Sequence, residues 1–307
     1  MTTVLITGGA GFIGSHLAEH FQDKANVRVL DNLRTGFRAN LSGMKADFVE
    51  GSVLDPRLLA EVIEGADYVF HLAAMVSVPE SVERPQECVT TNTLGLLNVL
   101  EAAAAAKVKK LCFSSSAAVY GDNPVVPKLE SMIPEPQSPY AVTKLDGEYY
   151  CDLYRRRGLL NTVTLRYFNV YGPRQNPRSQ YAAAVPIFID RALRNEPLEI
   201  YGDGEQTRDF IYVKDIVAAN VFATMESPAA GVYNVACGRR MTVNDLAREI
   251  IRITGSKSEI CYRPVRAGDV KHSQASIERF KAAGFEPAYD FAAGLQATID
   301  YMRPLIH

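Results

Sequence analysis

Short apolar runs alternate with amphipathic stretches through the first half of the chain. The runs lie at 3–7, 27–31, 47–51, 68–74 and 110–116. Segments with a helical pattern separate them, one beginning near Phe12 and another covering 91–107. Near-continuous apolar strands that alternate with helices are typical of a parallel sheet covered on both faces. We therefore expect an α/β fold with a Rossmann-like, doubly wound parallel sheet.

The second half of the chain has a different texture. A long helix is predicted to begin at Pro139, because Ser138 is a favourable N-cap and proline is favoured in the first turn. After about Tyr171, turn residues become frequent at 172–180 and 195–209, which indicates a smaller, loop-rich α/β region. Helix and strand patterns return in two segments, which are expected to rejoin the sheet. These segments are 211–225 and 232–236.

Composition excludes several classes of protein. The chain has 307 residues, of which 47% are hydrophobic and 22% charged, an ordinary globular balance. A net charge of -2 predicts neither a nucleic-acid partner nor a polybasic membrane patch. No segment has the pattern of a secretion signal, and no apolar run approaches the roughly 20 residues of a spanning helix. The five scattered cysteines are typical of reduced thiols in a cytoplasmic protein.

The glycine-rich stretch TGGAGFIG, residues 7–14, follows a predicted strand and opens a predicted helix. Gly8, Gly11 and Gly14 would permit a tight turn, close approach of the backbone to a pyrophosphate, and close packing of the helix on the strand. The helix N-terminus would add N–H groups and a positive dipole end. Asp31, at the end of the second strand, would accept hydrogen bonds from a ribose and repel a 2′-phosphate, which favours NAD. Arg34 keeps NADP open, since arginine binds phosphate.

Three polar residues indicate proton transfer. Tyr140 and Lys144 lie four apart on one predicted helix and share a face. A phenol has a pKa of about 10, and a nearby cation is expected to lower it and favour the phenolate. Ser116 ends a predicted strand of the same sheet, at the edge where ligands bind, so its hydroxyl can hold a substrate oxygen in line with Tyr140. The five histidines form no ligand pattern beyond His16 and His20, and no metal site is expected.

These motifs resemble the extended short-chain dehydrogenase/reductase family, and within it the nucleotide-sugar 4-epimerases of the UDP-glucose or UDP-N-acetylglucosamine type. The likeness covers nearly the whole chain in order. Besides Ser116, Tyr140 and Lys144 it rests on TGGAGFIG (7–14), HLAA (71–74), SVPES (77–81, as a loop over the cofactor), Asn92 with Gly95, RYFNVYGPR (166–174), RDF (208–210) and RAGD (266–269).

The resemblance implies two domains and a set of binding residues. An NAD-binding domain would comprise 1–170 with about 210–237, and a nucleotide-sugar domain about 171–209 with 238–307. Implied NAD contacts are Gly8, Gly11, Phe12, Ile13, Gly14, Asp31, Asn32, Ser52, Val53, Leu72, Ala73, Ala74, Tyr140, Lys144 and Tyr167. Implied substrate contacts are Ser77, Ser116, Tyr140, Asn169, Val185 (with Pro186, against uracil), Arg208, Arg266 (diphosphate), Asp269 (ribose) and Ser273.

Departures from the family pattern bear on the reaction. Relatives often have Gly-Asp where this chain has Gly51 and Ser52, so the backbone would have to make the adenine contact that the aspartate makes in them. Phe210 replaces a tyrosine and keeps the ring. Related dehydratases and decarboxylases carry acidic residues directly after the active-site hydroxyl residue, whereas this chain has Ala117 and Ala118. The alanines favour simple epimerisation over elimination of water.

The implied reaction passes through a 4-keto sugar. Tyr140 takes the proton of the sugar 4-hydroxyl while NAD accepts the hydride from C4, and the hydride then returns to the opposite face. Relatives restricted to glucose and galactose tend to carry tyrosine where this chain has Ser273, so the pocket is expected to admit UDP-N-acetylglucosamine and UDP-N-acetylgalactosamine as well as the plain sugars.

Several alternatives to this substrate and reaction stay open. They are a strict UDP-glucose/UDP-galactose 4-epimerase, another epimerase, decarboxylase or net oxidoreductase of the same family, and a non-catalytic NAD-binding scaffold. The resemblance also implies a homodimer, paired through helices near 92–106 and 140–157. No nucleic-acid or membrane partner is expected.

Overall fold

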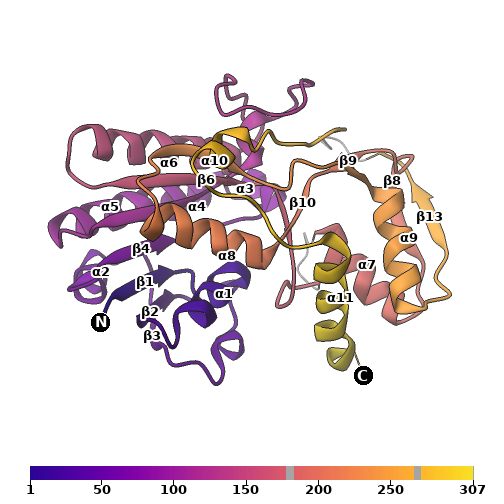
Figure 1. Cartoon of the computed structure of the whole chain (residues 1–307), viewed down its shortest axis with the longest axis horizontal. Coiled ribbons are helices and arrows are strands. Elements are labelled where there is room, and N and C mark those ends of the chain that lie inside the picture. The colour runs from indigo at the N-terminus through magenta and orange to yellow at the C-terminus, as the bar shows by residue number, and fades with distance from the viewer. Residues whose placement is uncertain (178–182, 266–270, 307) are drawn as a thin grey trace.

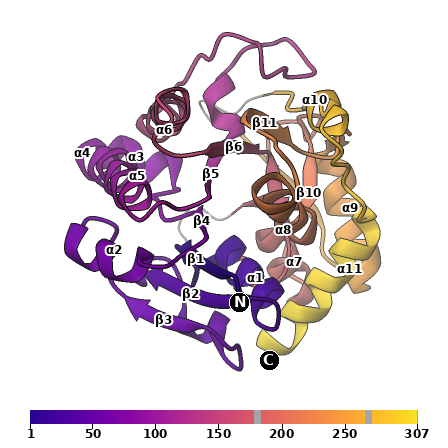
Figure 2. The ribbon, with the colours of Figure 1, turned by 60° about the vertical axis from the view of Figure 1, so that its left-hand side comes forward.

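A seven-stranded parallel sheet forms the centre of the molecule, for which a computed structural model describes residues 1–177, 183–265 and 271–306. Figure 1 shows the whole chain, and Figure 2 labels the strands of this sheet in their order, β11-β6-β5-β4-β1-β2-β3. The strands are β1 (Thr3–Thr7), β2 (Asn26–Asp31), β3 (Asp47–Glu50), β4 (Tyr68–His71), β5 (Lys110–Ser116), β6 (Thr162–Tyr167) and β11 (Gly231–Val235). The chain runs outward from β1 to β3 and then returns to β4 on the other side of β1. This reversal defines a switch point where ligands bind, and the predicted doubly wound fold is confirmed.

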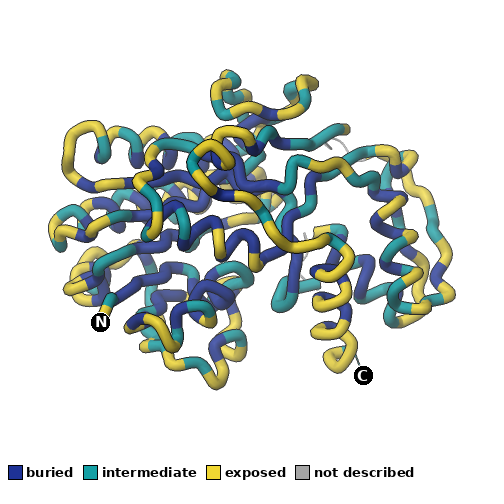
Figure 3. Tube along the Cα trace, in the orientation of Figure 1, coloured by how far each residue is buried: buried dark blue, intermediate teal, exposed yellow. Residues whose placement is uncertain are grey.

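Helices cover both faces of the sheet (Figure 2). On one face, α1 (Phe12–Phe21) and α8 (Val213–Val221) share an apolar cluster with β1, β2, β6 and β11. On the other, α2 (Pro56–Ile63), α5 (Gly95–Ala105) and α6 (Pro139–Arg156) pack on β4 and β5. The inner strands are therefore largely buried, whereas the edge strand β3 and the outer sides of the helices are partly exposed (Figure 3). Ser138 caps α6 as predicted, since its side chain accepts a hydrogen bond from the Ala141 N–H.

A second group of elements packs around its own apolar core. Its helices are α7 (Ala184–Leu193), α9 (Val243–Thr254) and α11 (Phe291–Met302). Short strand pairs frame it: β7 (Asn169–Tyr171) with β10 (Phe210–Tyr212), β8 (Leu198–Tyr201) with β13 (Ile260–Arg263), and β9 (Thr207–Arg208) with β12 (Met241–Thr242). α10 (Glu278–Ala282) contacts β11 of the main sheet. The boundaries of the two expected domains stay a prediction.

Two segments differ from the sequence expectation. The helix expected at 91–107 begins earlier, as α4 (Pro85–Val89), and continues through a π-helical turn (Thr90–Leu94) into α5. A π-turn holds an extra residue and changes which side chains point inward. Here Asn92 is buried, where its side chain bonds both the N–H and the C=O of Met75, at 2.7 and 3.0 Å.

The second difference lies in the stretch SVPES, which is not a loop. It forms α3 (Val78–Glu83), and the Ser77 hydroxyl caps this helix by accepting the Glu80 N–H at 3.1 Å. Serine followed three residues later by glutamate is a signal for a helix start, so the sequence carried the information. Within the described residues, no helix is long and apolar enough to cross a bilayer.

Candidate active site

The glycine-rich turn between β1 and α1 is shaped by crowding. Gly8 has a φ of +71°, and a Cβ there would lie 2.7 Å from the Ala73 nitrogen. A Cβ at Gly14 would lie 2.3 Å from the Gly8 oxygen. Only glycine fits both positions. Gly11 caps α1 without a side-chain hydrogen bond, and the first turn, which includes Phe12, holds no acidic residue. The helix N-terminus is thus suited to an anion.

Asp31 ends β2 beside this turn. Its carboxylate is buried and accepts the N–H of Ala10 at 2.9 Å and of Leu33 at 2.8 Å. Burial raises the pKa of Asp31, and these two bonds oppose the rise. Each carboxylate oxygen has a further lone pair, so the group can also accept ribose hydroxyls. Asn32 forms the turn that follows, accepting the N–H of Arg34 at 3.1 Å.

Two further loops meet the same edge of the sheet. After β3, the Ser52 hydroxyl accepts the Leu54 N–H at 3.1 Å, and Val53 is buried. After β4, the N–H of Leu72 donates to the Thr7 oxygen at 3.0 Å. Because the carboxyl ends of parallel strands face one way, the sequence-predicted NAD residues come together here. The uncapped helix start, the glycine-rich turn and the carboxylate of Asp31 have the chemistry to bind NAD.

The three proposed catalytic residues also converge at this edge. Ser116 ends β5, Tyr140 lies in the first turn of α6, and Lys144 lies one turn later. The hydroxyl of Ser116 hydrogen-bonds Tyr140. The ammonium nitrogen of Lys144 lies 5.8 Å from the centroid of the Tyr140 ring and donates to the Ser114 oxygen at 2.7 Å.

Burial dominates the electrostatics of this set. It raises the pKa of Tyr140, and only the bond from Ser116 opposes it with any weight. It also lowers the pKa of Lys144 to about 8. In the protein alone, desolvation of the phenolate is the largest influence on the pKa of Tyr140. The expected effect of Lys144 on that pKa stays a prediction. Oxidised nicotinamide brings the additional positive charge when NAD is bound.

A buried ion pair that was not foreseen anchors α6. Arg166 of β6 donates to both carboxylate oxygens of Glu148, at 2.8 and 2.6 Å, and both side chains are at most 4% exposed. Ser115, next to Ser116, donates to the same carboxylate. Glu148 is one helical turn beyond Lys144. The helix and strand that carry the proposed catalytic residues are thus joined behind them. A charged residue on a helix gives no sign in sequence of such burial.

Asp209 joins the segments expected to hold the substrate, and it too was missed. Its carbonyl oxygen accepts both the backbone N–H and the side-chain amide of Asn169, each at 3.2 Å. Its carboxylate is fully buried and accepts the N–H of Cys237 at 2.9 Å and of Ala275 at 3.1 Å. Burial raises the pKa of Asp209 to about 6. The RDF motif, residues 208–210, was used to predict a role for Arg208, although it also contains Asp209.

Arg208 and Ser273 both hydrogen-bond the same backbone carbonyl. Arg208 donates to the Thr207 oxygen at 3.0 Å, and the N–H of Ser273 donates to the same oxygen at 3.0 Å. Both side chains are half-buried. Ser77 caps α3, as described above. The two other residues of this set, Arg266 and Asp269, lie outside the described residues.

Two of the predicted contact residues point into packed regions. Val185 is buried in the first turn of α7, within the second apolar core. The hydroxyl of Tyr167 bonds the Ser114 hydroxyl at 3.1 Å and the Asn220 side chain at 2.8 Å, beneath the sheet edge. Their roles in substrate and cofactor binding stay predictions.

The histidines of the described chain have structural partners. A ring nitrogen of His16 bonds the Pro173 oxygen at 2.9 Å, and one of His71 bonds the Thr7 hydroxyl at 2.7 Å. Burial lowers the pKa of His71 to about 3, so its ring is neutral. No group of three or more His, Cys, Asp or Glu among the described residues could hold a metal ion.

Three solved structures are similar over nearly the whole chain. The UDP-N-acetylglucosamine 4-epimerase of Methanobrevibacter ruminantium, in complex with UDP-N-acetylmuramic acid, is 41% identical with a TM-score of 0.96, covering 99% of both chains. The UDP-glucose 4-epimerase of Thermotoga maritima, with UDP-glucose, is 41% identical with a TM-score of 0.95, covering 100% of both. The UDP-glucose 4-epimerase of Thermus thermophilus, with NAD, is 37% identical with a TM-score of 0.90, covering 98% of this chain and 99% of that one.

The model of the NAD dependent epimerase/dehydratase family matches residues 4–236, well over half of the chain. The protein belongs to this family. It is an NAD-dependent epimerase, and therefore an isomerase. The predicted family, class of enzyme and cofactor are confirmed.

Lys144→Met should reveal the cost of the buried ammonium. The pKa of Lys144 is lowered to about 8 from an ordinary 10.5, so the unfolded chain binds more protons than the folded one between these values. The stability of the wild type without NAD should rise with pH relative to the variant, by up to about 1.4 kcal/mol per pH unit in this window. Urea unfolding of both proteins across the window measures this difference. A difference that stays constant with pH would contradict it.

Proposed function

We propose that this enzyme interconverts C4 epimers of a UDP-hexose and accepts N-acetylated sugars together with the plain ones. The observation that carries the proposal is the convergence of Ser116, Tyr140 and Lys144 at the NAD edge of the sheet, with no acidic side chain directly after Ser116. Ala117 and Ala118 occupy that place and open a short helical turn. An epimerisation needs only a proton carrier and the cofactor, which is what this arrangement offers.

The residues of the chain have separate tasks in this reaction. Ser116 holds the C4 oxygen, and Tyr140 takes its proton and later returns it. Lys144 adds positive charge near the phenolate. The glycine-rich turn and Asp31 would hold NAD, which would supply the hydride chemistry that oxidises C4 and reduces it again from the opposite face. Asn169 and Arg208 anchor the diphosphate while the sugar turns, a task suited to the fork of an arginine. Arg266, outside the described residues, is proposed to share it, with Asp269 on the ribose.

Replacing Tyr140 with phenylalanine tests the reaction. Tyr140→Phe removes the proton carrier and should lower the epimerisation rate by about 10²- to 10⁴-fold. The NAD content should stay at the wild-type level. Product stereochemistry read by NMR, with UDP-glucose and UDP-galactose and their N-acetylated forms, measures the exchange.

An unchanged rate in Tyr140→Phe would contradict the mechanism. Net accumulation of NADH by the wild type would favour an oxidoreductase or decarboxylase. A wild type that exchanges none of the four sugars would favour a scaffold.

Ser273 is proposed to set the choice of sugar. It lies beside Arg208, through their shared bond to Thr207, and its side chain is small and half-buried. A small side chain leaves room for an acetamido group at the sugar 2-position. The runner-up, strict use of UDP-glucose and UDP-galactose, would require another residue to fill this space.

Ser273→Tyr should suppress activity on the N-acetylated sugars and spare the plain ones, because the ring would occupy the space of the acetamido group. Ser273→Ala, which stays small, is the matched control and should retain both activities. The ratio of kcat/KM for UDP-N-acetylglucosamine to that for UDP-glucose is the measurement. Equal loss on both sugars would refute this role for Ser273.

A homodimer is supported by an apolar stripe on α6. Val142, Tyr149 and Leu153 share one face of the helix and are 49%, 62% and 46% exposed. Val89 and Leu94 are exposed on the neighbouring segment, which packs against α6. Exposed apolar side chains gathered in one place mark protein interfaces. The proposed dimer buries this stripe against a second copy of the chain.

Val142→Glu with Leu153→Glu should therefore convert the dimer into monomers, since burying unpaired charges at an interface is costly. Leu159→Glu, at an exposed leucine beyond the end of α6, is the control and should leave the dimer intact. Sedimentation equilibrium distinguishes the two states. A wild type that sediments as a monomer would contradict the proposal.

We also propose a cytoplasmic location. All five cysteines are unpaired, and Cys88, Cys112 and Cys151 are buried in the core. Free thiols are typical of proteins from a reducing compartment.

A further inference from the structure

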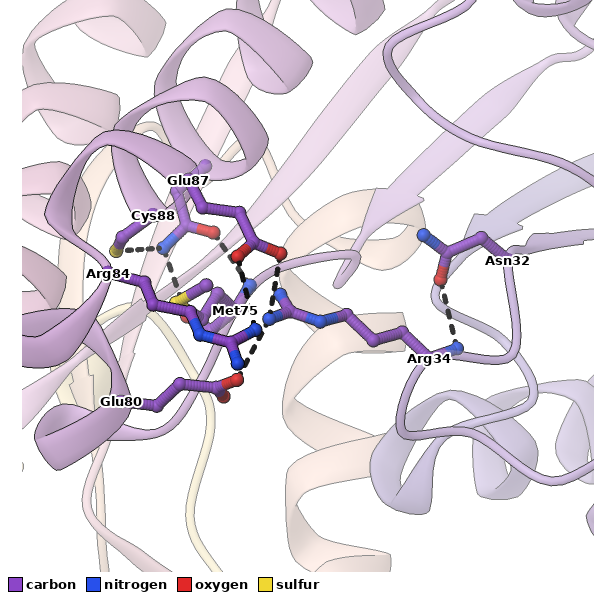
Figure 4. Close-up of polar contacts among 8 residues, drawn as sticks. Asn32, Arg34, Met75, Glu80, Arg84, Glu87 and Cys88 are labelled. Atoms are coloured by element: carbon purple, nitrogen blue, oxygen red, sulfur yellow. Dashed lines mark hydrogen bonds and ion pairs between the residues drawn. The ribbon is translucent and has the colours of Figure 1, made fainter.

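Arg34 reaches from the loop after β2 to the helices that follow β4. It follows Asp31 and Asn32 in the loop after β2, and Figure 4 shows its side chain extended toward the helices that follow β4. Its guanidinium lies 2.9 Å from a carboxylate oxygen of Glu80 on α3 and 2.9 Å from one of Glu87 on α4. Two carboxylates from two helices therefore hold one arginine.

The position of this contact follows from the order of the strands. β1 lies between β2 and β4, and the glycine-rich turn follows β1. Neighbouring strands are about 4.8 Å apart, so the loops after β2 and β4 stand about 10 Å apart on either side of that turn. A dinucleotide with its pyrophosphate on the turn and its ribose on Asp31 would lie between these loops. Arg34 connects them across it.

We propose that Arg34, Glu80 and Glu87 form a strap that closes over bound NAD and slows its release. The family's cofactor, and not the proposed sugar, is the basis of this inference. A cofactor that ends each cycle in its starting oxidation state has no need to leave, so retention favours turnover. The strap must open for NAD to enter, and its members suit this, with side-chain exposures of 28%, 27% and 45%. Ion pairs this exposed are individually weak.

The far end of the strap is tied to the catalytic helix. Ser81, next to Glu80 on α3, accepts the backbone N–H of Tyr140 at 3.1 Å. Arg84, between the two helices, adds a contact of 3.6 Å to Glu87. Arg34 is thus directed to a fixed part of the protein. A 2′-phosphate of NADP would have to draw it away from two carboxylates and would also meet Asp31. The pairing of Arg34 closes the alternative that the sequence left open and favours NAD.

The release rate of NAD tests the strap without any sugar. Holoenzyme loaded with radiolabelled NAD is diluted into excess unlabelled NAD, and retained label is followed with time. Arg34→Ala and the double variant Glu80→Gln/Glu87→Gln should each release NAD about three- to tenfold faster. The triple variant should be no faster than Arg34→Ala, because all three changes break the same contact. About 1 M salt should speed release from the wild type but not from the variants.

The pair of Lys45 and Asp23 supplies the control. Its atoms are also 2.9 Å apart, but it lies at the opposite edge of the sheet, before β2 and β3. Lys45→Ala should leave the release rate unchanged. If Arg34→Ala released NAD at the wild-type rate, the proposal would be overturned. It would also be overturned if adding Arg34→Ala to the double variant speeded NAD release as much as it does in the wild type, or if Arg34→Ala changed only the affinity for NADP. Loss of sugar specificity with normal strap behaviour would count only against the proposed function.

Discussion

The buried ion pair between Glu148 and Arg166 is the contact on which the geometry of the proposed catalytic residues depends. Two charges removed from water are tolerated only when each satisfies the other, and leaving one alone costs about 3–5 kcal/mol. The pair therefore holds α6 in a single position against β6, with the help of Ser115. Tyr140 and Lys144 lie on that helix, and Ser116 follows Ser115, so the pair sets how the three approach one another.

A second constraint joins the two parts of the molecule at Asp209. One buried carboxylate accepts the N–H of Cys237, just after β11, and of Ala275, just after Ser273. The carbonyl of the same residue holds Asn169. The segments proposed to bind the sugar nucleotide come from distant parts of the chain, and their backbones meet at this residue. The substrate side of the site is thus built on the same principle as the catalytic side, with a buried charge behind the residues that face the ligand.

Much of the fold and of the site followed from local patterns. Apolar runs separated by helices predicted the sheet. Short motifs predicted that the glycine-rich turn and Asp31 bind the cofactor and that Ser116, Tyr140 and Lys144 act in catalysis. Sequence patterns did not predict the charged residues that support the site from buried positions. Glu148 looked like an ordinary helix residue, and Asp209 was overlooked beside Arg208. The capping signal that starts α3 was present but was interpreted as a loop. Sequence patterns report the surroundings of a residue along the chain, while burial depends on segments that are distant in sequence.

The sequence by itself determined the family and the cofactor, and it predicted the glycine-rich cradle and the residues proposed to transfer the proton, because strand, turn and helix signals are encoded within a few neighbouring residues. Only the tertiary structure decided how these groups behave. It placed Tyr140 where burial raises its pKa, and it directed Arg34 to Glu80 and Glu87 instead of a phosphate. Desolvation and ion pairing depend on distances through space, and those distances exist only once the chain has folded.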